Sequence, residues 1–332
     1  MDHAERARAI ADEALFPRAL ATDVADLVPR DLLDLLAAEG FYGMSAPAEV
    51  GGWALETAAT HAIIEAFAGG CLTTTFVWIQ HHNVVRAVAA SGLRDAWLAP
   101  LATGARRAGI SRAGERPGPP MLTVRADGHD LVLDGEAPWV TGWGRIDVVL
   151  VGARDGEDVA RVLLDATDAP GLTVTPLSLV AVNAAGTVTL RFEGVRVPAA
   201  RLVEREAAAA TAARDPIGLR TNGSLALGIA DRCARLARAP EVGAALGRAV
   251  DDARAALDAA DADGLPHARA LAADLAWRAA GALTVDQGAR AVLAGDHPGR
   301  LAREAQFVLV FGTRASIRDE LLGALAGPGA RP

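Results

Sequence analysis

The sequence predicts an α+β, multidomain fold in which a β-sandwich or barrel lies between two helical domains. Short segments rich in Val, Leu and Thr gather between about residues 105 and 203, whereas the flanking sequence is Ala-rich and repeats apolar residues at helical spacing. The 332 residues, 51% of them hydrophobic, are enough for two or three domains with buried cores. We therefore expect a helical domain (1–104), a β domain (105–203), a second helical domain (204–326) and a flexible tail (327–332).

The first block has the pattern of helices joined by a glycine-containing loop. Apolar residues three and four positions apart predict a helix over residues 4–15. A second helix begins near Pro29 and stops at Gly40. Prolines and glycines between residues 45 and 52 then predict a loop. Two longer apolar runs predict helices over residues 55–68 and 73–90.

The middle block shows the turn and alternation signals of strands. The turn 127–130, Asp-Gly-His-Asp, separates two apolar stretches and predicts a β-hairpin. Residues 188–192 alternate between apolar and polar with a period of two. Further short strands, each bounded by turn residues, are expected at 148–151, 159–164 and 172–176. Helical spacing returns in the last block, where we expect helices over residues 222–239, 242–262, 267–293 and 300–311.

Composition and charge exclude several classes of protein. The formal net charge is −8, no lysine occurs and no basic stripe is present, which argues against a nucleic-acid partner. Apolar runs end well before the ~18 residues of a membrane span, and the charged N-terminus lacks the features of a secretion signal. Cys71 and Cys233 are expected to be buried thiols, and the seven histidines show no metal-ligand spacing, so no metal is expected. These features predict a cytoplasmic protein with no membrane partner.

Three local strings, taken with the order of the blocks, resemble a known family. Residues 40–52 contain Gly-Phe-Tyr-Gly followed by a Pro and a Gly-Gly pair, and residues 134–141 read Asp-Gly-Glu-Ala-Pro-Trp-Val-Thr. Residues 192–198 read Phe-Glu-Gly-Val-Arg-Val-Pro and lead out of the β domain. Together they resemble the acyl-CoA dehydrogenase family over nearly the whole chain. The resemblance implies a C-terminal four-helix bundle and FAD as the cofactor.

The resemblance also implies which residues bind that cofactor. Trp139 matches the family residue that packs against the isoalloxazine ring, and Thr141 matches the one that reaches the flavin N5 edge. Ser111 ends a strand where it would bond the pyrimidine side. Gly312 and Thr313 match the end of the family string Tyr-Glu-Gly-Thr and are expected at the same site. A planar aromatic cofactor needs such an apolar wall with a few placed donors. The alternatives are a core tryptophan and an ordinary strand-end serine.

The helix over residues 73–90 resembles the one that lines the acyl pocket in the family. Trp78 and His82 are four residues apart and share a helix face, whereas His81 points about 100° away. These three residues, with Arg220, are the expected substrate-binding side chains. The alternative for the histidines is a structural hydrogen bond to a backbone carbonyl.

The chain departs from the family at the catalytic base. The family removes the α-proton of an acyl thioester with a Glu, and the matching position here is Phe311, which cannot accept a proton. Members that carry the Glu earlier match residues 217–222, which hold no carboxylate. Asp215 is the nearest acid and is either the base or a residue that begins the next helix. The base is therefore unassigned.

Three functions are compatible with these features. The first is FAD-dependent α,β-dehydrogenation of an acyl-CoA thioester, with hydride transfer to flavin N5 and an electron-transfer flavoprotein as a candidate acceptor. The second is a non-catalytic partner subunit of a heteromeric acyl-CoA dehydrogenase, which suits the missing Glu. The third is a flavin-dependent oxygenase on the same fold, because that chemistry needs no α-proton base. The implied helical bundle also predicts a homo- or hetero-oligomer, a dimer or tetramer.

Overall fold

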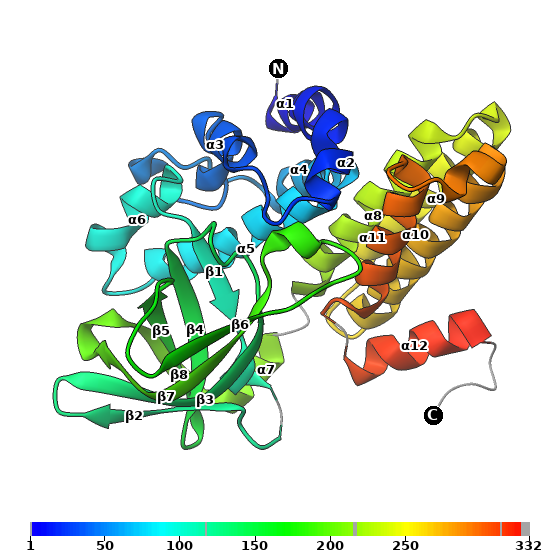
Figure 1. The fold of residues 1–332 in the computed structure, drawn as a ribbon. Helices are drawn as coiled ribbons and strands as arrows, with labels where there is room; N and C mark the ends of the chain where they lie inside the picture. The colour runs from blue at the N-terminus through cyan, green and yellow to red at the C-terminus, as the bar shows by residue number, and fades with distance from the viewer. Residues whose placement is uncertain (1, 117, 215–217, 313, 327–332) are drawn as a thin grey trace.

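The sheet lies at one end of the molecule, the N-terminal helices lie over it, and the C-terminal helices stand beside both (Figure 1). This arrangement confirms the predicted order of helical block, sheet and helical block. The predicted tail and two candidate site residues, Asp215 and Thr313, lie outside the residues that the structure describes. The computed structural model describes residues 2–116, 118–214, 218–312 and 314–326.

The first helical segment is longer than its sequence pattern indicates. Helices α1 (His3–Ile10) and α2 (Phe16–Asp23) are joined by a π-helical turn at Ala11–Leu15. A capping box starts α1, because Asp2 and Glu5 satisfy each other's backbone N–H groups. The wider π turn directly precedes a proline in the first turn of α2, so the chain stays helical across a residue that lacks a backbone donor. The predicted helix therefore ends eight residues too early.

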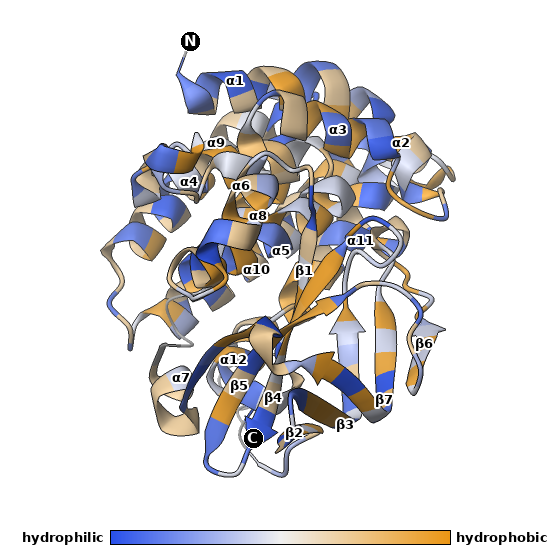
Figure 2. Cartoon of the chain, turned by 90° about the vertical axis from the view of Figure 1, so that its left-hand side faces the viewer, coloured by the Kyte–Doolittle hydropathy of each residue, from blue (hydrophilic) through white to orange (hydrophobic). Residues whose placement is uncertain are grey.

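Helices α4 and α5 form the centre of the N-terminal block. Both are buried over most of their lengths, because α4 packs against the C-terminal block and α5 packs against the sheet. Figure 2 shows strand β1 directly below α5. The sequence signals do not predict α6, because this helix is short and contains Pro100. The bounds are α3 Arg30–Ala38, α4 Thr57–Gly70, α5 Leu72–Ala89 and α6 Arg94–Ala102.

Within the described residues, the strands form one eight-stranded sheet in the order β6-β7-β3-β2-β4-β5-β8, and β1 pairs with β4 in parallel. The predicted hairpin is the antiparallel pair β2–β3. The sheet surrounds its own apolar core, to which most strands contribute Val, Leu or Ala side chains. Its last strand extends past the predicted domain boundary at residue 203. The bounds are β1 Ala108–Ser111, β2 Leu122–Asp127, β3 Asp130–Val140, β4 Val148–Asp155, β5 Asp158–Asp165, β6 Leu172–Pro176, β7 Val188–Pro198 and β8 Leu202–Ala207.

The C-terminal block contains four long helices that lie side by side, α8 to α11, with α12 set apart from them (Figure 1). Helix α10 ends earlier than predicted, because Gly288 takes a left-handed φ of 69°. In the described part of the chain no helix is both long and apolar enough to cross a membrane. The bounds are α7 Ala208–Arg214, α8 Gly218–Leu236, α9 Pro240–Ala259, α10 Leu265–Gln287, α11 His297–Val310 and α12 Ala315–Ala326.

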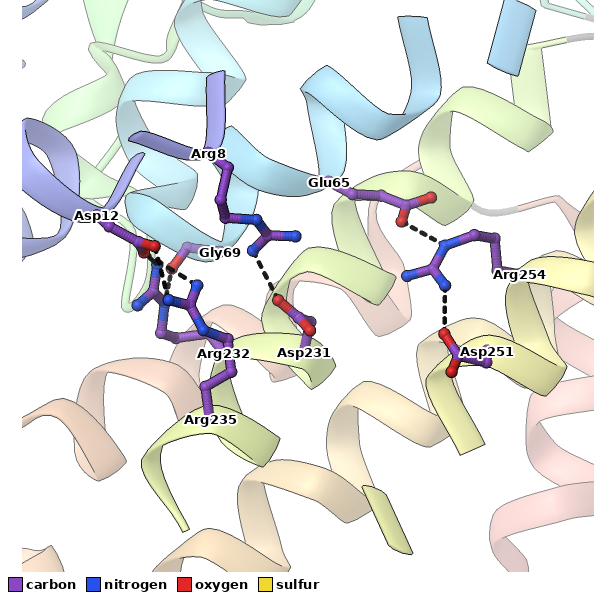
Figure 3. A network of polar contacts seen from close by, with 9 residues as sticks. All are labelled: Arg8, Asp12, Glu65, Gly69, Asp231, Arg232, Arg235, Asp251 and Arg254. Atoms are coloured by element: carbon purple, nitrogen blue, oxygen red, sulfur yellow. Dashed lines mark hydrogen bonds and ion pairs between the residues drawn. The ribbon is translucent and has the colours of Figure 1, made fainter. Parts of the chain in front are cut away.

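Ion pairs fix the N-terminal helices to the C-terminal block (Figure 3). Asp12 of the π turn accepts hydrogen bonds from Arg232 and Arg235 of α8. Arg232 also donates to the backbone carbonyl at the end of α4, 2.6 Å away. The network is partly buried, because Arg232 is only 4% exposed. These contacts join segments about 220 residues apart, so the relative placement of the two helical blocks depends on them.

Candidate functional site

Trp139 lies near the end of β3 and points away from the sheet core. Its side chain is 57% exposed, and its backbone has a φ of +64°, which bulky residues rarely adopt. The pairing of β3 with β7 shifts register between Ala137 and Val140, so the strand bulges where Trp139 stands. The bulge turns the indole out of the sheet and onto the surface. A strained, exposed aromatic residue of this kind needs a reason outside the core.

Thr141 lies two residues further on and is buried. Its hydroxyl group is 3.3 Å from the hydroxyl group of Thr187, which directly precedes β7. Strand β1 passes close by: a Cβ at Gly109 would lie only 2.9 Å from the carbonyl oxygen of Thr141. Ser111 follows two residues after this glycine and so points to the same side of β1. The fold thus brings the two strand ends that carry Ser111 and Thr141 together.

The Ser111 hydroxyl group is buried and has no partner. The residue is 3% exposed, and its Oγ atom makes no hydrogen bond to any described residue. Burying a hydroxyl group without a partner costs about 1–3 kcal/mol. The Ser111 hydroxyl group is therefore free to pair with a bound group.

Helix α5 packs against the end of β3 through Val77. A Cβ built on Gly142 would lie 3.5 Å from the Cγ1 atom of Val77. One residue earlier on α5, Phe76 faces the C-terminal block. The ring of Phe76 lies edge-on to the rings of Phe307 and Phe311, with centroids 4.9 Å apart in both cases. This cluster, Phe76, Phe307 and Phe311, links α5 to the end of α11. Phe311, at the expected position of the base, is thus part of an apolar wall.

The backbone around Phe311 is held by two arginines and a close helix contact. The buried Arg269 donates to the carbonyl oxygens of Val308 and Phe311, at 2.6 and 3.3 Å. Arg314 donates to the carbonyl oxygen of Gly312. Gly312 has a φ of +62°, which favours glycine, and a Cβ there would lie 2.8 Å from the Nδ2 atom of Asn222 on α8. An amide, rather than a carboxylate, therefore stands next to this segment on α8.

The three candidates on α5 are fully buried. His81 accepts a hydrogen bond from the backbone N–H of Ala108 at 3.1 Å and lies 3.0 Å from the carbonyl oxygen of Leu101. Burial lowers the pKa of His81 to about 3, so the ring is neutral. The contacts of His81 are therefore those of a structural histidine bonded to the backbone, which is the alternative to substrate binding.

Trp78 and His82 do share a face, as the spacing predicts, and their rings meet edge-on with centroids 4.5 Å apart. That face points into the N-terminal helical core, where Trp78 also meets Phe67 at 5.1 Å. The indole N–H of Trp78 and both ring nitrogens of His82 have no hydrogen-bond partner among the described residues. Burial holds the pKa of His82 well below its usual range. Their role in substrate binding stays a prediction.

Arg220 is bound into a polar network between α4, α8 and α9. Its guanidinium group donates to Asp258 and Ser224, each at 2.7 Å, and lies 3.6 Å from Glu65. Glu65 is 4% exposed and also accepts from Arg254 at 2.8 Å (Figure 3). These contacts occupy the guanidinium group of Arg220. Contact with a substrate would therefore require this network to rearrange.

The structure thus gathers part of the predicted set and adds residues that the sequence did not single out. The strand ends that carry Ser111 and Thr141 lie together, Trp139 projects from the bulge two residues before Thr141, and Gly312 follows the end of α11. In the described ranges no three His, Cys, Asp or Glu side chains are close enough to hold a metal ion. The added residues are Thr187, Phe76, Phe307 and Asn222, which reach the site by tertiary packing alone.

Comparisons with known proteins agree with this fold. The model of the acyl-CoA dehydrogenase N-terminal domain matches residues 2–105. An isobutyryl-CoA dehydrogenase of Dictyostelium discoideum is 30% identical over 243 residues, which are 69% of this chain and 58% of that protein. A probable acyl-CoA dehydrogenase of Bacillus subtilis is 26% identical over 217 residues, 60% of this chain and 56% of that protein. The matched region thus spans little more than half the length of these curated relatives.

A solved structure extends the likeness to the remainder of the chain. The structure of a glutaryl-coenzyme A dehydrogenase in complex with glutaryl-CoA aligns with a TM-score of 0.85 at 16% identity, covering 99% of this chain and 95% of that one. At this identity the alignment shows the fold. The match of the N-terminal family model and the curated relatives identify the chain as a member of the acyl-CoA dehydrogenase family.

Proposed function

We propose that the chain binds FAD beside Trp139 and acts as an oxidoreductase of the acyl-CoA dehydrogenase type. The observations that carry the proposal are the exposed indole of Trp139 at positive φ and the buried, unpaired hydroxyl group of Ser111, on strand ends that the contact between Gly109 and Thr141 brings together. The residues present suit the flavin end of such a cofactor, because an aromatic wall and a free polar group are what a planar heterocycle requires. When bound, the flavin would supply the hydride acceptor.

The chain's own residues would bind and orient both ring and substrate. Trp139 offers an apolar face, and Ser111 offers a hydroxyl group without a competing partner. Thr141 and Thr187 form a second hydroxyl pair at the same strand ends. The cluster of Phe76, Phe307 and Phe311 would offer an apolar surface between α5 and the end of α11. These residues position and desolvate, but none of them can remove a proton.

For the substrate we propose an acyl-CoA thioester, and for the reaction its α,β-dehydrogenation. The α-proton then needs an acceptor, which Phe311 cannot be. We keep Asp215 as the candidate base, and Asp215→Asn should abolish flavin bleaching by substrate while leaving the flavin bound. The acceptor of the electrons, for which we propose an electron-transfer flavoprotein, and an oligomeric assembly remain predictions.

The packing of Phe311 also favours a second candidate, a partner subunit without dehydrogenase activity. Among the described residues, the ring contacts of Phe311 are with two other phenylalanines, which is an arrangement for packing. Such a subunit would keep the fold and the flavin wall while a related chain supplies the Glu. A flavin-dependent oxygenase on this site would also dispense with the base.

One experiment separates these possibilities. The purified protein is examined by visible spectroscopy, reconstituted with FAD where needed, and mixed anaerobically with a panel of acyl-CoA thioesters. Flavin bands that bleach with a thioester support the dehydrogenase. Flavin bands that no thioester bleaches favour a partner subunit, or an oxygenase if the protein consumes oxygen with supplied reduced flavin. A protein that never retains flavin contradicts the proposal.

A further inference from the structure

A shallow hollow lies away from the proposed flavin site, at the junction of the loop over residues 45–54, the C-terminal end of α5 and the start of α6. Its volume is about 370 Å³, within the ~300–1,000 Å³ of small-molecule sites. None of the residues proposed for the flavin or for the acyl group lines it. Its lining includes four alanines, Ala46, Ala54, Ala89 and Ala90, and two arginines, Arg86 and Arg94.

The wall of the hollow is mostly apolar and its shape depends on small side chains. Four alanines face it, from both the loop and the end of α5. The loop is held tightly: the backbone N–H of Ala54 bonds to the carbonyl oxygen of Ala46 at 3.2 Å, and a Cβ at Gly52 would lie 2.1 Å from that same oxygen. Ala54 adopts a φ of +45°, which is strained for alanine. The loop that forms one side of the hollow is thus held in a defined conformation by its own backbone contacts.

The charge at the hollow is positive and only partly compensated. Arg86 donates to the hydroxyl group of Ser45 at 3.0 Å and to the side-chain oxygen of Asn83 at 2.9 Å, both neutral groups. No carboxylate among the described residues forms an ion pair with Arg86. Arg94 pairs with Glu49 and donates to a backbone carbonyl. Two guanidinium groups therefore face one carboxylate, which leaves a net positive charge beside an apolar wall.

We propose that this hollow binds a short aliphatic carboxylate. The carboxylate group would take the place of a neutral partner on Arg86, since a charge-assisted hydrogen bond is about twice as strong as a neutral one. The aliphatic part would cover the alanine wall. A free phosphate would satisfy the charge but not the apolar wall, and a neutral alcohol would do the reverse, so the hollow prefers a ligand with both parts.

Isothermal titration of the whole protein with sodium hexanoate tests the proposal. Hexanoate should bind in the millimolar range or tighter. 1-Hexanol, which lacks the negative charge, and inorganic phosphate, which lacks the aliphatic chain, should each bind at least about tenfold more weakly. Arg86→Met should weaken hexanoate binding by about tenfold or more, because the charge-assisted bond is lost. Because the readout is hexanoate binding, its outcome is independent of flavin and of turnover.

Two further variants make the result decisive. Ala90→Leu fills the hollow and leaves both arginines in place, so it should also abolish hexanoate binding. Arg125→Met removes an exposed arginine of β2, outside the hollow, and should leave the affinity unchanged. No heat of binding with the wild-type protein, equal binding of 1-hexanol, or unchanged affinity in Arg86→Met or Ala90→Leu overturns the proposal.

Discussion

The rings of Phe76 and Phe311 meet edge-on with centroids 4.9 Å apart, and this contact joins α5 to the end of α11. The sequence resemblance predicts that Phe311 occupies the position of the family's catalytic Glu. An edge-to-face pair contributes about 0.5–1.5 kcal/mol beyond the area it buries. The chain therefore has a stabilising contact where the resemblance implies a proton acceptor.

Replacing Phe311 by Glu tests what this position does. We expect the free energy of unfolding to fall by about 1–3 kcal/mol, because the edge-on contact is lost and a carboxylate is brought next to two aromatic rings. If the site retains the rest of a dehydrogenase, Phe311→Glu should bleach bound flavin faster with an acyl-CoA than the wild-type protein does. Stopped-flow absorbance under anaerobic conditions measures the rate. Phe311→Gln is the matched control, because it has the shape of Glu without the basic oxygen, and equal rates for both variants would contradict a base role.

Trp139 should matter for flavin binding and little for the fold. Its exposed ring makes no contribution to the sheet core, and a non-glycine residue at positive φ costs about 1–2 kcal/mol. Trp139→Gly should therefore leave the melting temperature of the flavin-free protein equal or higher, while weakening FAD binding by about tenfold through loss of the aromatic wall. Thermal melts and fluorescence titration with FAD give the two quantities.

Trp277→Ala is a suitable control, because Trp277 is exposed to a similar degree, 41%, but lies on α10. It should leave FAD affinity unchanged. A similar loss of FAD affinity in both variants would contradict a specific contact between Trp139 and the flavin.

Replacing Ser111 by Ala should raise stability and weaken FAD binding. Its buried hydroxyl group lacks a partner in the flavin-free protein, so Ser111→Ala should raise the free energy of unfolding by up to about 1–3 kcal/mol. The same change should weaken FAD binding by about tenfold, because a donor or acceptor for the ring is lost. Chemical denaturation and FAD titration of one preparation measure both effects. A variant that is less stable, with normal FAD affinity, would show that Ser111 only packs.

The sequence locates the strand ends of this site but not what surrounds them. The string around Trp139 and Thr141 is local, so it can be recognised without a structure. The bulge that exposes Trp139 cannot, because it depends on the register between β3 and β7. Thr187 and Asn222 reach the site through tertiary packing, which leaves no local pattern.

The histidine pair on α5 illustrates a second limit of sequence reasoning. Helical spacing correctly places Trp78 and His82 on one face, yet a helix that is buried on several sides carries no polar face to reveal which side meets a pocket. Burial on all sides also hides the role of His81, whose partners come from α6 and β1.

The buried histidines should make stability depend on pH. Burial, which outweighs the hydrogen bond to Leu101, lowers the pKa of His81 to about 3, against an ordinary value of 6.5. Burial also lowers the pKa values of His61 and His297 to about 4. The unfolded chain therefore binds more protons than the folded one between pH 6.5 and the folded-state values. Stability should be full above pH 6.5 and fall as the pH drops through this window.

The variant His81→Gln measures the contribution of His81 to the pH dependence of stability. Gln cannot be protonated, so the free energy of unfolding should change less steeply between pH 6.5 and pH 4 than in the wild-type protein. His61, His82 and His297 keep part of the slope. At pH 7 the variant should be about 1–3 kcal/mol less stable, because the contacts to Leu101 and Ala108 are disturbed. Urea denaturation at a series of pH values measures both. His129→Gln, at an exposed turn, should leave the curve unchanged, and a His81→Gln curve parallel to that of the wild-type protein would mean that His81 does not govern the acid sensitivity.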